Sequence, residues 1–230
     1  MRTRRGGTAR GHSVTLSDVL VLALDTATPT LVAGLADWSQ HGVTEVLAER
    51  AVPSGTRHAE LLTPAIAAVL DDAGLTTGDL DVVVTGLGPG PFTGLRVGVV
   101  TAAALADARG LPVIGVCSLD AIGSGARTVV TDARRKEIYW ATYDEDGARI
   151  DGPAVVRPEQ LGLSGPFVGD PAFAERLGAE VAAADVTTTG LLRAAAAQLA
   201  DPSSAGPLVP MYLRRPDATP PTAIKAVTPE

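Results

Sequence analysis

Short aliphatic runs separated by polar turns recur along the chain and predict β-strands. The first run covers Val19 to Leu24, and a second covers Leu31 to Leu35 after a turn at 25–29, which predicts strand, turn and strand. Two later runs, DVVVT at 81–85 and PVIGV at 112–116, predict two more strands. The first half of the chain is therefore expected to build a sheet.

After Leu35 we interpret the chain as alanine-rich helical stretches, of which His58 to Leu70 is the clearest. Its apolar residues recur at helical spacing, and Pro64 either kinks this helix or opens it after a Thr63 cap. A second helix is predicted from the glycine-rich loop at 86–94 to about Arg109. Helices and strands in this order indicate an α/β fold.

The second half of the chain repeats the opening pattern of strand, aspartate, turn and strand. TVVTD at 128–132 is followed by a turn at 133–136 and by a strand at 137–143. A single match of this kind also arises by chance, so the repeat is a hypothesis of two related α/β lobes with a cleft between them. A shift of 107 residues aligns Asp132 with Asp25, Ile138 with Leu31, Trp140 with Ala33, and Asp144 with Asp37.

The lobes are expected to be unequal. We predict a first lobe at 18–117 and a smaller second lobe at 118–215, with short helices near 171–177 and 191–200, the last able to pack back on the first lobe. Residues 1–17 are expected to be a disordered basic extension and 216–230 a disordered tail. Within the proline-rich end, only Met-Tyr-Leu-Arg at 211–214 is expected to be anchored.

Composition narrows the class of protein. The 230 residues are 46% hydrophobic, which permits a packed core and excludes a wholly disordered or fibrous chain. The single cysteine, Cys117, excludes an intramolecular disulfide and suggests a reducing cytoplasm. His12, His41 and His58 are too scattered to form a zinc cluster, so we expect no metal and no cofactor. No apolar run reaches the roughly 20 residues of a membrane span, and no signal peptide is recognised.

The charge argues against strong nucleic-acid binding. The formal net charge is −7, and the first 17 residues carry four arginines and no acid, so the rest of the chain stands at −7 − 4 = −11. Such a body repels phosphate backbones.

The loop GLGPGPFTGLR at 86–96 is the most specific local feature. Glycines between a buried strand and a helix allow backbone N–H groups to point at an anion, with Thr93 as a natural N-cap. Arg96 in the first helical turn indicates a carboxylate or phosphate partner, or an exposed side chain with none. Alternatively the glycines only serve the turn and a smooth packing stripe at 94, 98, 102 and 106. The candidate anion contacts in this region are Gly88, Gly90, Thr93, Gly94 and Arg96.

Two strand-end aspartates complete the candidate anion or nucleotide site. Asp25, next to Thr26, and Asp132, near Arg134, would face each other across the cleft of a duplicated fold. The turns after them lack the glycines that bring a backbone close to phosphate, so both aspartates are interpreted more simply as turn caps. The basic triplet at 134–136 is either an RNA contact or a solvated hairpin tip.

The second helix also predicts an interface. Val97 to Ala106 contains no charged residue, whereas a helix that covers one face of a sheet needs only one apolar stripe. We interpret the excess as a partner interface, with a fully internal helix as the alternative. Together with the helix that begins at His58, the candidate interface residues are His58, Leu61, Leu62, Ala65, Val69, Gly94, Val97, Gly98, Thr101, Ala102 and Leu105.

Six segments follow one another in a recognisable order: LALDTAT, RHAELLTP, GLGPGPFTGLRVG, LPVIGVCSLDAI, TDARRKEIYWATY and VPMYLR. In this order, over about residues 19 to 215, they resemble the bacterial TsaB/YeaZ family of the tRNA threonylcarbamoyladenosine pathway. The resemblance implies an actin-like (ASKHA) duplicated fold of two RNase H-like lobes, the second one reduced. It also implies a TsaD-like catalytic subunit and a TsaE-like ATPase as partners, with tRNA bound only through the complex.

The same resemblance implies that the chain is not itself the transferase. The catalytic relative carries two metal-binding histidines four residues apart, and Ser118 and Ile122 stand at these positions here. Neither side chain binds a metal as imidazole does. Pro91 departs from the family pattern, in which a small polar residue is usual, and it removes an N–H from the loop.

The leading hypothesis is therefore a non-catalytic scaffold or activating subunit of a cytoplasmic tRNA-modifying complex. The alternative is a small actin-like ATPase or kinase that uses Asp25, Asp132 and the glycine loop. Self-association as a homodimer through the same two helices is compatible with the scaffold.

Overall fold

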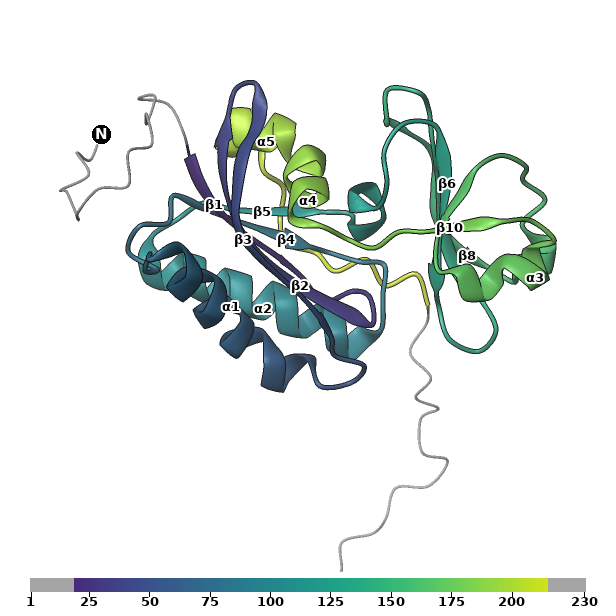
Figure 1. Cartoon of the computed structure of the whole chain (residues 1–230), viewed down its shortest axis with the longest axis horizontal. Helices are drawn as coiled ribbons and strands as arrows, with labels where there is room; N and C mark the ends of the chain where they lie inside the picture. Colours follow the sequence, from purple (N-terminus) through teal and green to yellow (C-terminus); the bar gives the residue numbers. More distant parts are fainter. Residues whose placement is uncertain (1–18, 215–230) are drawn as a thin grey trace, which may run out of the picture.

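The computed structural model describes residues 19–214, which form two α/β lobes lying side by side (Figure 1). The expectations for residues 1–17 and 216–230 lie outside the described residues. The first sheet has the strand order β3-β2-β1-β4-β5, and the second has the order β10-β9-β6-β7-β8. No helix within residues 19–214 is long and apolar enough to cross a bilayer.

The first lobe contains five strands and the two long helices. Its strands are β1 (Val19–Asp25), β2 (Thr30–Ser39), β3 (Gly42–Pro53), β4 (Val82–Gly86) and β5 (Val113–Val116). Its helices are α1 (His58–Ala73) and α2 (Phe92–Arg109).

The second lobe is built from shorter elements. Its strands are β6 (Arg127–Asp132), β7 (Ile138–Tyr143), β8 (Arg149–Val156), β9 (Phe167–Gly169) and β10 (Val181–Ala183). Its helical pieces are the 3₁₀ turns η2 (Pro158–Gln160) and η3 (Pro171–Phe173) and the one-turn α3 (Ala174–Leu177). The turn η1 (Ser118–Ala121) joins the lobes, and α4 (Thr188–Ala194), α5 (Ala196–Ala200) and η4 (Pro202–Ser204) follow the second sheet.

Sheet topology confirms the duplication. In each lobe the first three strands pair antiparallel, and the first strand then pairs parallel with the fourth, and the fourth with the fifth. The alignment by a constant 107 residues is wrong beyond the turn, however. Asp25 pairs with Val32, whereas Asp132 pairs with Ile138, so the second turn is one residue shorter and Ile138 corresponds to Val32 instead of Leu31.

Several elements differ from the sequence interpretation. The stretch after Leu35, interpreted as helical, contains the strand β3, because pairing along β2 overrides the helix propensity of its Ala, Glu and Leu residues. The strands β8, β9 and β10 were not predicted. Pro64 lies inside α1, which begins at His58, so the alternative start after Thr63 is wrong.

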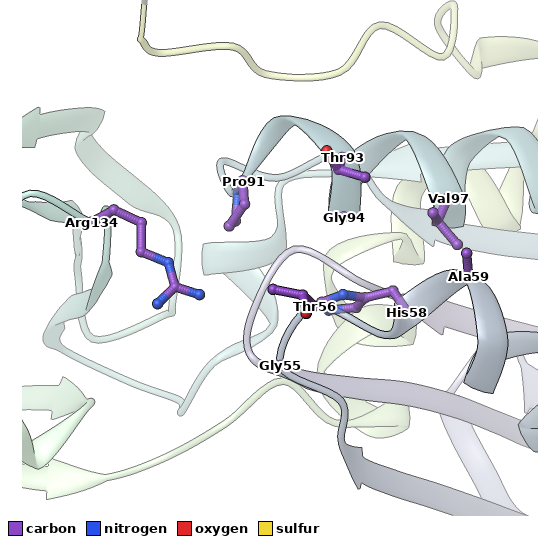
Figure 2. Close-up of a pocket in the computed structure, with 9 residues that line it drawn as sticks. All are labelled: Gly55, Thr56, His58, Ala59, Pro91, Thr93, Gly94, Val97 and Arg134. Atoms are coloured by element: carbon purple, nitrogen blue, oxygen red, sulfur yellow. The ribbon is translucent and has the colours of Figure 1, made fainter. Parts of the chain in front are cut away.

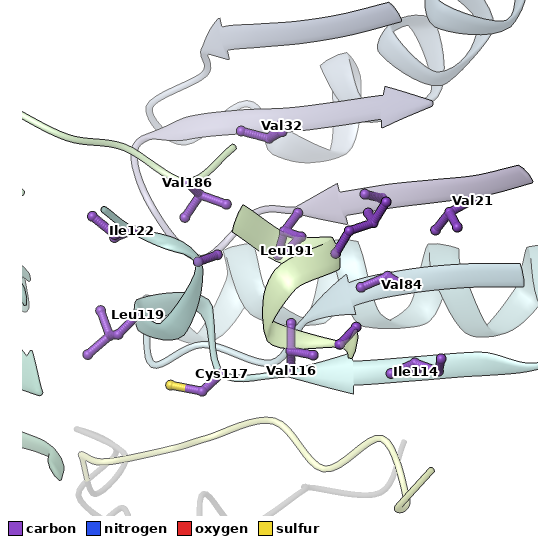
Figure 3. Packing of buried hydrophobic residues seen from close by; sticks show 14 of the residues in the cluster. Val21, Val32, Val84, Ile114, Val116, Cys117, Leu119, Ile122, Val186 and Leu191 are labelled. Carbon is purple, nitrogen blue, oxygen red and sulfur yellow. The ribbon is translucent and has the colours of Figure 1, made fainter. Parts of the chain in front are cut away.

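The first sheet is buried on both faces, which explains the uninterrupted apolar run of β1. Leu20, Leu22 and Leu24 alternate with Val21 and Ala23; the leucines join the cluster beneath α1 and α2, and the other two join the cluster beneath α4. Figure 3 shows Leu191 of α4 in one cluster with Val21, Val84 and Ile114 of the first sheet. The helix that follows the second sheet thus packs on the first, as Figure 1 also shows.

The small-residue stripe of α2 points inward. Gly94, Gly98, Ala102 and Ala106 are buried, and a Cβ added at Gly98 would lie 2.4 Å from Oγ1 of Thr26. That hydroxyl donates to the Gly94 carbonyl at 2.7 Å and accepts the Gly98 N–H at 3.0 Å. The stripe therefore brings α2 against the β1–β2 turn.

Replacement of this glycine tests the close approach. Alanine is the better helix former by about 1 kcal/mol, yet Gly98→Ala is expected to lower the free energy of unfolding by about 2 kcal/mol, because Thr26 must move and lose hydrogen bonds. Urea denaturation measures the effect. In a Thr26→Ala background the same change is expected to be neutral or stabilising, and a Gly98→Ala protein as stable as wild type would contradict the packing.

Candidate functional site

Asp25 is fully buried at the end of β1, where it caps the turn that follows. Its Oδ1 accepts the Ala27 N–H at 2.8 Å, and its Oδ2 accepts the hydroxyl of Ser118. Burial raises the pKa of the Asp25 carboxyl to about 6, against the opposing effects of the Ser118 and Ala27 hydrogen bonds and the charge of His58. The structure thus agrees with the turn-cap interpretation.

The glycine loop is packed against the chain itself. A Cβ at Gly86 would lie 1.8 Å from Oδ2 of Asp25, and one at Gly90 would lie 2.3 Å from the carbonyl oxygen of Ala27. The Gly88 N–H donates to Oγ of Ser118 at 3.1 Å. The glycines therefore permit close approach of the β1–β2 turn, which fills the space that an anion against this part of the loop would need.

The start of α2 differs from the expectation. The helix begins at Phe92 with Pro91 as N-cap, and no side chain caps it, so the predicted N-cap role of Thr93 is wrong. For Arg96 the sequence left two alternatives, a carboxylate or phosphate partner or an exposed side chain with no partner, and the described residues give it partners of another kind. Its guanidinium stacks on the ring of Phe92, 3.9 Å from the centroid, and its Nε donates to the hydroxyl of Tyr212 at 3.0 Å.

Tyr212 lies in the C-terminal segment that was expected to be anchored, and the anchoring is confirmed. The Met211 N–H donates to the Leu87 carbonyl at 2.8 Å, and Tyr212 packs on Phe92 with ring centroids 5.1 Å apart. The sequence analysis did not identify Phe92 and Tyr212 as partners of Arg96. The available signal was the spacing of Phe92 and Arg96, which lie four residues apart on one helix.

Asp132 caps its own turn in the second lobe. Its Oδ1 accepts the Arg134 N–H at 2.7 Å, and its Oδ2 lies 3.4 Å from the Arg134 guanidinium. Arg134, Arg135 and Lys136 all have positive φ, at 63°, 53° and 65°. Each such residue other than glycine costs roughly 1–2 kcal/mol, so neighbouring contacts must hold this turn in place.

Two arginines provide those contacts. The Arg214 guanidinium donates to the Arg134 carbonyl at 3.2 Å and pairs with Glu137. The Arg176 guanidinium donates to the Lys136 carbonyl at 2.8 Å. Hydrogen bonds thus hold the strained turn at both of its ends, at the carbonyls of Arg134 and Lys136.

A cavity of about 410 Å³ lies between the lobes. His58 borders it from the start of α1; its ring is 5% exposed and its Nε2 donates to the Thr28 carbonyl at 3.0 Å. Figure 2 shows Arg134 reaching toward the cavity from the second lobe. The lining residues are Gly55, Thr56, His58, Ala59, Pro91, Thr93, Gly94, Val97 and Arg134.

The predicted interface residues divide by burial. Six of them are buried in the first lobe: Leu62, Ala65, Val69, Gly94, Gly98 and Ala102. His58 is also buried. Four are half-buried where α1 and α2 meet at the surface: Leu61, Val97, Thr101 and Leu105.

The outer face of α2 carries apolar residues that are not among the predicted interface residues. Val100 is 63% exposed and Phe92 is 49% exposed. They point away from the inward stripe by helical geometry, since 92, 96 and 100 follow one line along the helix. One side of the uncharged stretch 97–106 therefore packs in the interior of the first lobe, and the other side is exposed.

Ser118 and Ile122 are both fully buried. Ser118 bonds to Asp25 and Gly88, and Ile122 belongs to the apolar cluster between the lobes. Across residues 19–214, no three His, Cys, Asp or Glu side chains are grouped in a way that could hold a metal ion.

Comparisons with known proteins agree with the two-lobed fold. Residues 46–219 match the family model described as TsaD, tRNA N6-adenosine threonylcarbamoyltransferase. The chain is 50% identical over 206 residues to an uncharacterized protein of Mycobacterium bovis, covering 87% of this chain and 94% of that protein. It is 48% identical over 210 residues to an uncharacterized protein of Mycobacterium leprae, covering 89% of this chain but 57% of that longer protein.

Named relatives are more distant. The Escherichia coli tRNA threonylcarbamoyladenosine biosynthesis protein TsaB is 33% identical over 153 residues, 60% of this chain and 63% of that protein. Among solved structures, YeaZ from Pseudomonas aeruginosa superposes with a TM-score of 0.67 at 26% identity, over 85% of this chain and all of that chain. These matches and the duplicated sheets show the expected two-lobed, actin-like α/β fold.

Asp25 predicts a pH dependence of stability. Because its folded pKa, about 6, lies above its ordinary value of 3.8, the folded state holds the proton more tightly. This contribution is complete below pH 4 and is lost as the pH rises through 6. From pH 4 to pH 7 the free energy of unfolding of wild type should fall by about 2–3 kcal/mol relative to Asp25→Asn, which stays neutral.

Urea denaturation at a series of pH values measures this difference. Asp132→Asn, at the half-exposed counterpart in the second lobe, is the matched control and should keep the wild-type profile. Parallel profiles for wild type and Asp25→Asn would show that burial does not perturb this carboxyl.

Proposed function

Because the chain belongs to the TsaD family and is a homologue of the TsaB/YeaZ proteins, we propose that it is a non-catalytic scaffold in tRNA threonylcarbamoyladenosine biosynthesis. In this role it pairs with a TsaD-like catalytic subunit and, through the complex, with a TsaE-like ATPase. It acts in the cytoplasm and meets tRNA only within that complex, since its own body is acidic.

The filled interior of the first lobe supports a role without chemistry at the glycine loop. The β1–β2 turn occupies the loop, and Asp25 and Asp132 each cap a turn. The two positions that the resemblance assigns to metal-binding histidines in the catalytic relative hold Ser118 and Ile122, which serve packing. This arrangement favours the scaffold over an ATPase that uses the same residues.

The open face of α2 is the observation that carries the proposal. Val100 and Phe92 are exposed on α2, and Leu61 of α1 and Val97 of α2 are half-buried apolar residues. Exposed apolar side chains at the core of a patch are typical of surfaces that associate with another protein. We propose that a TsaD-like subunit covers this face, and that a second copy of the chain covers it when that subunit is missing.

Val100→Glu tests this interface without touching the core, because the side chain is already solvated in the free chain. Burial of the new carboxylate at the joint should weaken the binding of a purified TsaD-like subunit by some hundredfold. Isothermal titration calorimetry measures the affinity, and circular dichroism melting verifies the fold. Ile150→Glu, at a residue of β8 that is 68% exposed, is the matched control and should bind normally.

Two results would overturn the assignment. A folded Val100→Glu protein that binds the catalytic subunit as wild type does would place the interface elsewhere. ATP hydrolysis by the isolated chain that disappears in Asp25→Asn would favour the enzyme hypothesis. In cells, loss of the tRNA modification with folded Val100→Glu would agree with the scaffold.

A further inference from the structure

The interlobe cavity is large enough for a small organic ligand. Its volume of about 410 Å³ falls within the range of ordinary ligand pockets, and the end of the glycine loop, with Pro91, Thr93 and Gly94, forms part of its wall. It is bordered by the starts of both long helices and, from the second lobe, by Arg134 (Figure 2). Residues from both lobes thus meet around one space.

The backbone of Arg134 is held in place by its neighbours. It lies in the strained left-handed turn, and the Arg214 guanidinium holds its carbonyl oxygen. The Arg134 guanidinium pairs with Asp132, whose carboxylate is 3.4 Å away at a partly exposed position. Such an exposed pair is weak, so a ligand oxyanion can replace the aspartate at little cost.

His58 contributes a ring nitrogen to the wall of the cavity. Because Nε2 donates to the Thr28 carbonyl, Nδ1 is the acceptor in the uncharged tautomer of the ring. The Nδ1 edge faces α2, lying 3.8 Å from where a Cβ of Gly94 would stand. Among the hydrogen bonds of the described residues, none is made by Nδ1, so this atom suits a hydroxyl donor from a ligand.

The start of α2 adds donors to the same wall. Its N-cap is Pro91, with no capping side chain, and the first N–H groups of a helix have no partner within the helix. Thr56 and Thr93 contribute hydroxyl-bearing side chains to the lining. The rest of the wall is apolar, formed by Ala59, Pro91 and Val97.

We propose that this cavity binds a small organic phosphate monoester. The ligand binds as its monoanion: the phosphate oxygens lie between the Arg134 guanidinium and the start of α2, the remaining P–OH donates to Nδ1 of His58, and the organic body packs on Ala59 and Val97. Val97 borders both this site and the proposed partner face, but the binding of the phosphate does not depend on a partner.

Phenyl phosphate, inorganic phosphate and dimethyl phosphate are the probes, titrated into the full chain at constant ionic strength and at about pH 6, where the monoester monoanion with its P–OH is well populated. The His58 ring resonances and the backbone amides of Gly55 and Gly94 report binding by NMR. Phenyl phosphate is expected to saturate at about 1 mM and inorganic phosphate at least fivefold more weakly, because it lacks the apolar body. Dimethyl phosphate, which models a nucleic-acid backbone and has no P–OH, is expected to bind at least tenfold more weakly than phenyl phosphate.

Arg134→Gly and Arg135→Gly form a matched pair. Each removes one positive charge and places glycine at a positive φ, which glycine adopts without strain, but Arg134 alone of the two lines the cavity. Arg134→Gly should weaken phenyl phosphate at least tenfold, and Arg135→Gly by less than twofold. Equal losses in the two variants, equal binding of the diester, or no saturable shift at the His58 ring would each overturn the proposal.

Discussion

The contact between the β1–β2 turn and the glycine-rich start of α2 is the constraint on which the first lobe depends. Thr26 joins two turns of α2 through one hydroxyl, and Asp25 joins the end of β1 to Ser118 and, through it, to Gly88. Every one of these contacts needs a backbone without Cβ on the opposing side. A single close approach therefore fixes the helix, the loop and the beginning of the second lobe together.

The two lobes are joined by more than the chain crossing at η1. Asp120 of η1 accepts the Tyr143 hydroxyl at 2.8 Å and pairs with Arg149, while the Arg193 guanidinium of α4 donates to the carbonyl of Gly123 at 2.6 Å. The buried Arg127 stacks on Tyr143, 3.9 Å from its ring centroid. One apolar cluster continues from the first sheet under α4 into the second sheet. The relative position of the lobes, and with it the shape of the cavity between them, is thus held by packing and by charged hydrogen bonds.

The long helix α2 serves three surfaces. Its small residues meet the β1–β2 turn, its exposed Val100 and Phe92 form the proposed partner face, and its first residues border the interlobe cavity. The uncharged stretch Val97 to Ala106 suits this division, because neither of its sides needs to be solvated once a partner is bound. A subunit on the outer face would therefore contact the element that also shapes the cavity.

Sequence patterns alone identified four of the five strands of the first half, the two long helices, the duplication and the family, because periodicity and the glycine loop are local signals. It also indicated that Asp25 and Asp132 cap turns. Tertiary structure decided the rest. The strand β3 depends on its pairing with β2, and the one-residue shift at Ile138 depends on the length of a turn. The direction of the stripe at Gly98 and the partner of Arg96, Tyr212, 116 residues away, depend on contacts between distant segments. A local pattern shows that a helix has apolar sides, but only packing determines which side is covered.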